Sequence, residues 1–198
     1  MSASLTNYVE ITLITDGIST INDIWRIVFR QIHLALVDSH NSEIGLSFPG
    51  YRFDRKNKTL GEKVRIFSAS EASLKAINLE KWLLGLSEYC HISKIRQVPK
   101  EVAYGCFGRK QYKNNYDKII RSKMVHLGVS EAEAKALVGE YVPVKCDLPY
   151  IPYQSMSSME AGRSADMLVS IQMKVVESEV LGSFNSFGLS NRVTVPIF

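Results

Sequence analysis

Several features that would assign this chain of 198 residues to a membrane or secreted class are missing from its sequence. No apolar run approaches the ~20 residues that cross a bilayer. The longest run, over residues 32–37, is interrupted by His33. The first residues also lack a basic stretch followed by an apolar one, which predicts that there is no signal peptide. We therefore expect a cytoplasmic protein that has no membrane segment.

Cysteine is scarce, and the usual metal-binding patterns are absent. The three cysteines (Cys90, Cys106 and Cys146) form no CxxC pair. This favours reduced thiols in a cytosol over a disulfide framework. No HExxH motif, paired Cys/His spacing or carboxylate-rich loop occurs. We therefore expect neither a metal nor another cofactor.

Charge is distributed unevenly, although the net charge is only +4. Residues 1–93 hold ten basic and ten acidic side chains, and residues 127–198 hold five basic and eight acidic ones. Between them, residues 94–126 hold nine basic side chains against two acidic ones. Such a block is typical of a binding site for a polyanion. Charge alone, however, favours a solvated surface.

The first 98 residues alternate between strand and helix patterns. Strands are predicted at "YVEITLIT", "EIGLSFP", "KVRIFSAS" and "YCHISKIRQV", where apolar and polar side chains alternate or short apolar runs end at a turn. Helical spacing follows Thr20, which can form a capping box with Asp23, and a second helix begins at Ser70. The order βαββαβ predicts a ferredoxin-like (RRM-like) domain over residues 1–98. The fold class is therefore α+β.

Residues 99–198 are predicted to form a second domain. The segment "PKEVAYGCFGRKQ", with Gly105 and Gly108, is expected to be loop-rich. A basic amphipathic helix is predicted over residues 114–127, and Ser130 is expected to cap a shorter acidic helix. Two strand patterns, "VKCDLPYIPY" and "MLVSIQMKVV", predict a small β-sheet, and a serine-rich loop lies between them.

The basic helix is one candidate site. If it begins near Lys110, it places Lys110, Lys118 and Arg121 opposite its apolar stripe, where they could contact phosphates of duplex RNA. Arg109 and Gln111 lie just before residue 114, and they have the geometry to pair with guanine and adenine edges. The alternative is a solvated helix whose lysines lie along apolar surface.

His33 and a serine cluster are the second candidate. A neutral imidazole with a pKa near ~6.5 can accept a proton at physiological pH. It could activate an RNA 2′-hydroxyl without a metal, and positioned groups of this kind contribute ~10²–10⁴-fold to a rate. Ser155, Ser157 and Ser158 carry hydroxyls that could hold a ribose or phosphate. The alternative is a structural histidine at a helix edge and serines that only mark a loop.

Six segments of the chain together resemble a known family. They are, in order, "QIHLALV", "IGLSFP", "LGEKVRIFSAS", "RKQYKNNYDKIIRSKMVHLGVSEAEA", "DLPYIPYQSMSS" and "FGLSNRVTVPIF". In these segments the chain resembles the CRISPR-associated repeat-processing endoribonucleases of type I-F systems. Those enzymes cut precursor CRISPR RNA (pre-crRNA) at the base of the repeat hairpin.

The resemblance implies roles for individual residues. His33 would deprotonate the 2′-hydroxyl while Ser155 holds that ribose, with Ser157 and Ser158 at neighbouring hydroxyl positions. The products would end in a 2′,3′-cyclic phosphate and a 5′-hydroxyl, and the reaction would need no metal. The segment that holds Arg109, Gln111 and Lys113 would read the lowest base pairs of the stem.

The resemblance also implies partners. The protein would stay on the 3′ hairpin of the mature crRNA as a subunit of a type I-F Cascade effector complex, in contact with a backbone subunit. On its own we expect a monomer.

The chain departs from the family at two places. Its basic helix has fewer arginines, and lysine cannot reproduce the arginine fork on phosphates. Phe187 stands near the expected active site where some relatives have a tyrosine, so another group must orient His33. Two alternatives therefore stay open: a non-catalytic subunit that binds the crRNA hairpin, and a general RNA-binding ferredoxin-like module.

Overall fold

The computed structural model describes residues 3–112, 115–143, 146–153 and 167–198. Contacts divide the chain into two compact units. One unit joins Met1–Lys110 to Leu148–Phe198, and the other is Gln111–Asp147. The two domains predicted over residues 1–98 and 99–198 stay a prediction.

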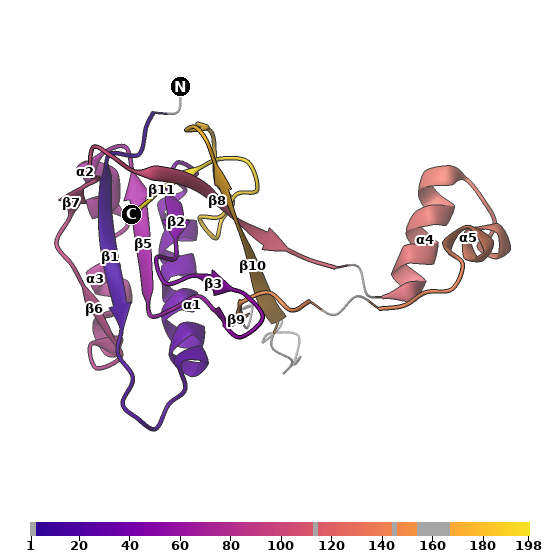
Figure 1. Cartoon of the computed structure of the whole chain (residues 1–198), viewed down its shortest axis with the longest axis horizontal. Helices are drawn as coiled ribbons and strands as arrows, with labels where there is room; N and C mark the ends of the chain where they lie inside the picture. Colours follow the sequence, from indigo (N-terminus) through magenta and orange to yellow (C-terminus); the bar gives the residue numbers. More distant parts are fainter. Residues whose placement is uncertain (1–2, 113–114, 144–145, 154–166) are drawn as a thin grey trace. The chain divides into compact units, whose positions relative to one another are not determined.

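The first sheet of the larger unit is antiparallel, with the strand order β2-β5-β1-β6, and β7 also pairs with β1. Along the chain, α1 follows β1, and α2 and α3 follow β5 (Figure 1). The elements are β1 (Asn7–Leu13), α1 (Ile21–Ser39), β2 (Gly45–Ser47), β5 (Lys63–Ser68), α2 (Glu71–Ala76), α3 (Leu79–Trp82), a 3₁₀ turn (Leu84–Leu86), β6 (Cys90–Ile92) and β7 (Arg96–Gln97). A small antiparallel hairpin of β3 (Arg52–Phe53) and β4 (Lys58–Thr59) lies between β2 and β5 along the chain.

Helix α1 begins where its sequence predicts. The Thr20 hydroxyl accepts a hydrogen bond from the Asp23 backbone N–H, and the Asp23 carboxylate accepts one from the Thr20 N–H, so the predicted capping box is confirmed. The apolar residues at helical spacing are buried, among them Trp25, Val28 and Ile32. Because α1 packs against β1 and α3 and also against β9 of the second sheet, both sheets of the larger unit contact this helix.

One strand of the second sheet lies where the sequence predicts a loop. Its order is β11-β8-β10-β9, all antiparallel. The strands are β8 (Ala103–Lys110), β9 (Tyr150–Tyr153), β10 (Met167–Val176) and β11 (Val195–Ile197). The prediction that "PKEVAYGCFGRKQ" is loop-rich is therefore wrong. A Cβ atom at Gly105 would overlap the Ile197 side chain, and one at Gly108 would overlap Asn191. These glycines therefore lie inside a strand where neighbouring residues pack directly against the backbone.

A helix lies within residues 114–127, the range predicted for the basic helix, and it begins at Tyr116. Helix α4 (Tyr116–Leu127) is capped by the Asn115 side chain and ends at Gly128, whose φ is +66°. Lys110 is the last residue of β8, so it does not lie on the helix. Helix α5 (Glu131–Val138) is capped by Ser130, as predicted, and the structure adds that Ser130 and Glu133 form a capping box. Helix α5 packs on α4.

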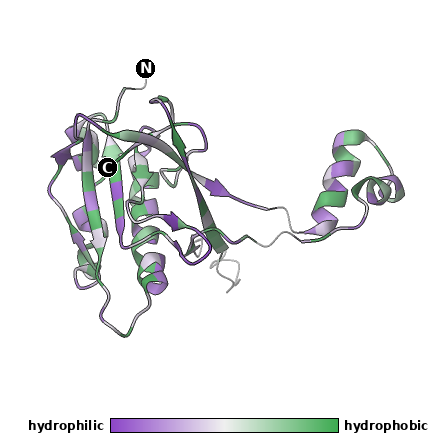
Figure 2. Cartoon of the chain, in the orientation of Figure 1, coloured by the Kyte–Doolittle hydropathy of each residue, from purple (hydrophilic) through white to green (hydrophobic). Residues whose placement is uncertain are grey.

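One hydrophobic core joins the two sheets of the larger unit. It includes Ile11 and Ile66 from the first sheet and Phe107, Ile151 and Ile171 from the second. The carboxyl end of β8, by contrast, is hydrophilic (Figure 2). The two sheets therefore form one packed body that leaves a polar strand end outside the core. In the part of the chain that the structure describes, no helix is long and apolar enough to span a membrane.

The cap of α1 can be tested by substitution. Thr20→Ala removes the hydroxyl that accepts from the Asp23 N–H, and we expect the free energy of unfolding to fall by about 1 kcal/mol. Thr20→Ser keeps the oxygen and should fold with nearly the wild-type stability. Urea denaturation of the three proteins measures the difference, and an unchanged midpoint for Thr20→Ala would contradict this role of the cap.

Candidate active site

His33 lies half-buried on α1, and aromatic rings surround it. Its imidazole stacks on the Phe187 ring, with centroids 4.1 Å apart and planes 13° apart. The Tyr153 ring meets it edge-on at 5.4 Å. Phe187 in turn lies parallel to Phe29, one turn earlier on α1, at 5.9 Å. The ring is therefore held between α1, β9 and the segment that precedes β11.

A backbone carbonyl fixes which imidazole nitrogen can act. His33 Nδ1 lies 2.8 Å from the carbonyl oxygen of Ser186. A carbonyl oxygen only accepts hydrogen bonds, so Nδ1 of the neutral ring carries the hydrogen and donates it. The lone pair of the neutral ring is then on Nε2, which has no hydrogen-bond partner among the described residues. This arrangement leaves Nε2 as a proton acceptor.

Burial keeps this histidine neutral. It lowers the pKa of His33 below the ordinary value of 6.5, and the hydrogen bond to Ser186 offsets part of that effect by favouring the charged ring. At neutral pH the ring is therefore unprotonated, the state that a general base requires.

Arg109 lies near this histidine at the end of β8. Its guanidinium carbon is 5.6 Å from the centroid of Phe187, and one of its terminal nitrogens is 3.0 Å from Sδ of Met167. Burial lowers the pKa of Arg109, although an arginine stays charged in proteins. Its Nε is buried and has no hydrogen-bond partner in the described part of the chain. A cation placed in this way is suited to an acceptor supplied from outside the protein.

The structure brings only some of the predicted site residues together. His33, Arg109 and Phe187 form one cluster, and Lys110 follows Arg109 as an exposed residue at the end of β8. Three further residues belong to the smaller unit and are exposed: Gln111, Lys118 and Arg121. Four predicted residues lie outside the described residues: Lys113, Ser155, Ser157 and Ser158.

Two neighbours of His33 were not found by sequence reasoning. The carbonyl of Ser186 leaves no trace in a sequence, because every residue has one. Tyr153 could have been found from the strand pattern, because residues two apart on a strand share a face and Tyr153 follows Ile151 at that spacing. In the structure both side chains are buried. Burial raises the pKa of the Tyr153 hydroxyl, so it is a neutral neighbour of the imidazole.

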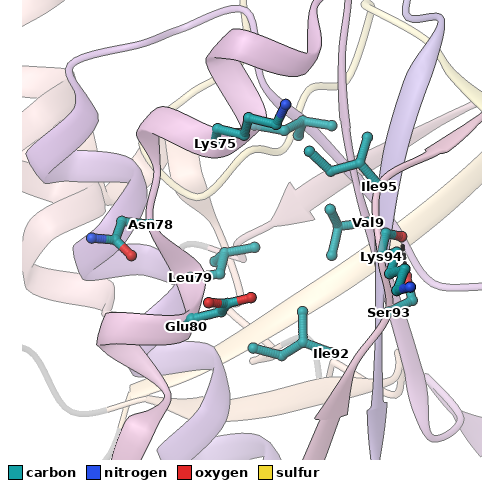
Figure 3. Close-up of a pocket in the computed structure, with 10 residues that line it drawn as sticks. Val9, Lys75, Asn78, Leu79, Glu80, Ile92, Ser93, Lys94 and Ile95 are labelled. Carbon is teal, nitrogen blue, oxygen red and sulfur yellow. Dashed lines mark hydrogen bonds between the residues drawn. The ribbon is translucent and has the colours of Figure 1, made fainter.

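A separate hollow of about 210 Å³ lies on the first sheet and contains none of the predicted site residues (Figure 3). The hollow is lined by residues of β1, of the stretch from α2 to α3, and of β6 and the segment after it: Val9, Leu74, Lys75, Asn78, Leu79, Glu80, Ile92, Ser93, Lys94 and Ile95. Lys75 already pairs with Glu71, at 3.2 Å. Within the described ranges, no three His, Cys, Asp or Glu side chains gather in a way that could hold a metal ion.

Comparison with known proteins decides the family. The family model of the CRISPR-associated protein Cas_Csy4 matches residues 8–198. This chain belongs to the Csy4 family. The resemblance to type I-F repeat-processing enzymes is thereby confirmed.

Two relatives of the chain are named CRISPR-associated endonuclease Cas6/Csy4. The Pseudomonas aeruginosa (strain UCBPP-PA14) protein is 29% identical over 192 residues, and the Escherichia coli (strain UTI89 / UPEC) protein is 26% identical over 196 residues. Each alignment covers 97% of this chain and 99% of the relative. A solved structure titled "An RAMP protein binding different RNA substrates" aligns with a TM-score of 0.39 at 13% identity, over 98% of this chain and 100% of that one.

The environment of His33 predicts a measurable titration. Phe187→Ala removes the stacked ring and exposes the imidazole, so we expect the pKa of His33 to rise toward ~6.5. NMR titration of the histidine ring protons measures it. Phe53→Ala is the matched control, because the half-exposed Phe53 ring lies on β3 and not beside His33, and it should leave the pKa of His33 unchanged. A wild-type pKa at or above 6.5 would show that burial does not control this ring.

Proposed function

We propose that this chain is a metal-independent endoribonuclease that cuts pre-crRNA at the base of the repeat hairpin. One observation carries the proposal: in a chain of the Csy4 family, His33 donates through Nδ1 to the Ser186 carbonyl and keeps Nε2 as an acceptor. The names of the two relatives as CRISPR-associated endonucleases support the same class of activity.

In the proposed reaction His33 Nε2 takes the proton of a ribose 2′-hydroxyl. The 2′-oxygen attacks the adjacent phosphorus, the P–O5′ bond breaks, and the 5′-oxygen takes a proton from water. The products are a 2′,3′-cyclic phosphate and a 5′-hydroxyl. Because the base must be neutral, the rate should rise with pH through the pKa of His33, which burial places below 6.5. Ser155 is proposed to hold the attacking ribose, with Ser157 and Ser158 beside it.

The proposed scaffold is a ferredoxin-like (RRM-like) βαββαβ domain over residues 1–98, followed by an RNA-recognising half over residues 99–198. The antiparallel order β2-β5-β1-β6 and the helices after β1 and β5 support the first part. In this scaffold α1 carries His33, and its packing against β9 supports a site that draws on both halves.

Arg109 is proposed to read the base pair that closes the stem. Its charge has no carboxylate contact among the described residues, and it lies beside the aromatic ring that stacks on His33. A nucleotide whose 2′-hydroxyl is at His33 would place its base near this guanidinium. Arginine can donate two hydrogen bonds to guanine, which gives sequence selectivity. Gln111 is proposed to act on the next pair.

Phosphate contacts are proposed for Lys110, Lys113, Lys118 and Arg121. The exposure of Lys118 and Arg121 on α4 supports this role. We further propose that the protein stays on the 3′ hairpin of the mature crRNA, within a type I-F Cascade complex and against its backbone subunit, and that it is monomeric when isolated.

The catalytic base is tested by His33→Ala. We expect this variant to lose cleavage of the repeat RNA in EDTA, because no other described group is placed as an acceptor there, while hairpin affinity stays within about twofold of wild type. His91→Ala, exposed on β6, is the control and should cut normally. Cleavage by His33→Ala at the wild-type rate would disprove the assignment. A wild-type protein that binds the hairpin and never cuts it would favour the non-catalytic subunit.

The base contact is tested by Arg109→Ala. We expect it to weaken binding of the native hairpin by about 1–3 kcal/mol, and to lose far less on a hairpin whose closing pair is changed. Arg96→Ala, exposed on β7, removes the same charge elsewhere and should not distinguish the two RNAs. Equal loss on every hairpin would indicate a phosphate contact. Wild-type binding that ignores hairpin structure would favour a general RNA-binding module.

A further inference from the structure

The carbonyl that holds His33 belongs to a tight turn, and one side chain holds this turn together. Asn185 Oδ1 accepts hydrogen bonds from the backbone N–H of Phe187, at 2.9 Å, and of Leu189, at 3.1 Å. The Asn185 backbone adds two more bonds: its carbonyl accepts from the Gly188 N–H, at 2.8 Å, and its N–H donates to the Leu189 carbonyl, at 3.0 Å. Ser186 and Phe187 lie inside this closed loop.

The two ends of the turn are anchored to the larger unit. The Phe184 N–H donates to the Ser42 carbonyl, at 2.7 Å, and the Ser190 N–H donates to the carbonyl of Phe107 on β8, at 2.9 Å. Gly188 has a φ of +68°, and a Cβ there would lie 2.7 Å from Cγ of Leu46, so the backbone passes close to β2. The ends are therefore fixed, and the conformation of Ser186 and Phe187 depends on bonds within the turn.

We propose that Asn185 is a positioning residue for the cleavage reaction, holding the Ser186 carbonyl and the Phe187 ring against His33. The inference rests on the proposed function, because it assigns Asn185 a part in the same proton transfer. Asn185 is exposed, and its side-chain oxygen accepts two backbone hydrogen bonds of the turn, which is the contribution that the proposal assigns to it.

The physical reason lies in the tautomer of His33. Without Oδ1 the N–H groups of Phe187 and Leu189 lose their acceptor, and the turn can leave its present conformation. Once the Ser186 carbonyl moves away, nothing requires the hydrogen of the neutral ring to stay on Nδ1. A ring that carries its hydrogen on Nε2 cannot take the proton of a 2′-hydroxyl at that atom.

Groups on several elements lie around His33 and are unchanged when Asn185 is substituted. Tyr153 on β9 contacts the ring directly. Arg109 on β8 contacts Phe187, and Arg30 lies one turn before His33 on α1 and acts on the Tyr153 hydroxyl. No carboxylate of the described residues perturbs the ring. A change in His33 after substitution of Asn185 therefore reports on the turn.

The experiment compares Asn185→Ala with two other variants. Asn185→Asp keeps an oxygen that can accept both N–H groups and is the rescue variant. Asp16→Ala is the matched control, because the Asp16 carboxylate also accepts two backbone N–H groups (Ile18 at 2.9 Å and Ser19 at 2.6 Å) in the loop before α1. ¹⁵N NMR of the imidazole gives the tautomer of His33 without RNA. Thermal melting shows whether each variant is folded.

Three results are expected. In wild type and in Asp16→Ala, His33 carries its hydrogen on Nδ1, whereas in Asn185→Ala the two tautomers are mixed. Cleavage of the repeat RNA by Asn185→Ala falls about 10- to 100-fold, since a small misplacement of a reacting group can cost that much, and its KM changes little. The Asp variant recovers the Nδ1–H tautomer and most of the rate. The acid limb of the pH–rate profile of Asn185→Ala moves toward that of an exposed histidine.

The results distinguish the positioning role of Asn185 from the proposed function of the protein. An Asn185→Ala protein that is folded and keeps the wild-type tautomer, pH limb and rate would overturn the positioning role while leaving the proposed function intact. Equal losses in Asn185→Ala and Asn185→Asp would also overturn it. A wild type that cuts no repeat RNA would remove the proposed function, and the tautomer measurement would still decide whether Asn185 controls the ring.

Discussion

The hydrogen bond from His33 Nδ1 to the Ser186 carbonyl connects residues that are 153 positions apart in the chain, and the chemistry of the site depends on it. It selects Nε2 as the atom that can accept a proton. The stacked Phe187 ring fixes the plane of the imidazole, at 13° from its own. The imidazole of His33 is thus oriented by the Ser186 carbonyl and by the Phe187 ring, which carries no hydroxyl.

This geometry requires the two sheets to share a core. Helix α1 packs against β1 and also against β9, so the face that carries His33 meets Tyr153 from the second sheet. Strand β8 places Arg109 on the same aromatic cluster, and its neighbour Phe107 holds the end of the Ser186 turn. Packing of the shared hydrophobic core therefore sets the distances among His33, Arg109 and Tyr153, which are far apart in the sequence.

Glycines are required in this chain for two different reasons. Gly128 and Gly188 have positive φ values, and each lies in a tight bend. Gly105 and Gly108 lie inside strand β8, where any side chain would overlap Ile197 or Asn191. A sequence pattern cannot distinguish a glycine chosen for its backbone from one chosen for the space beside it. The prediction of a loop over β8 is wrong for this reason, and Lys110 lies at the end of this strand rather than on the basic helix.

The sequence by itself determined much of the local structure, although not β8, and it also determined the family. The capping boxes at Thr20 and Ser130, the buried stripe of α1 and the strand at residues 167–176 follow from nearest-neighbour chemistry and periodicity. The order of the short motifs was enough to place the chain in its family. Only the tertiary structure decided what holds His33. The group that does so is a main-chain carbonyl, which is present at every position and becomes specific only when folding brings it to the ring.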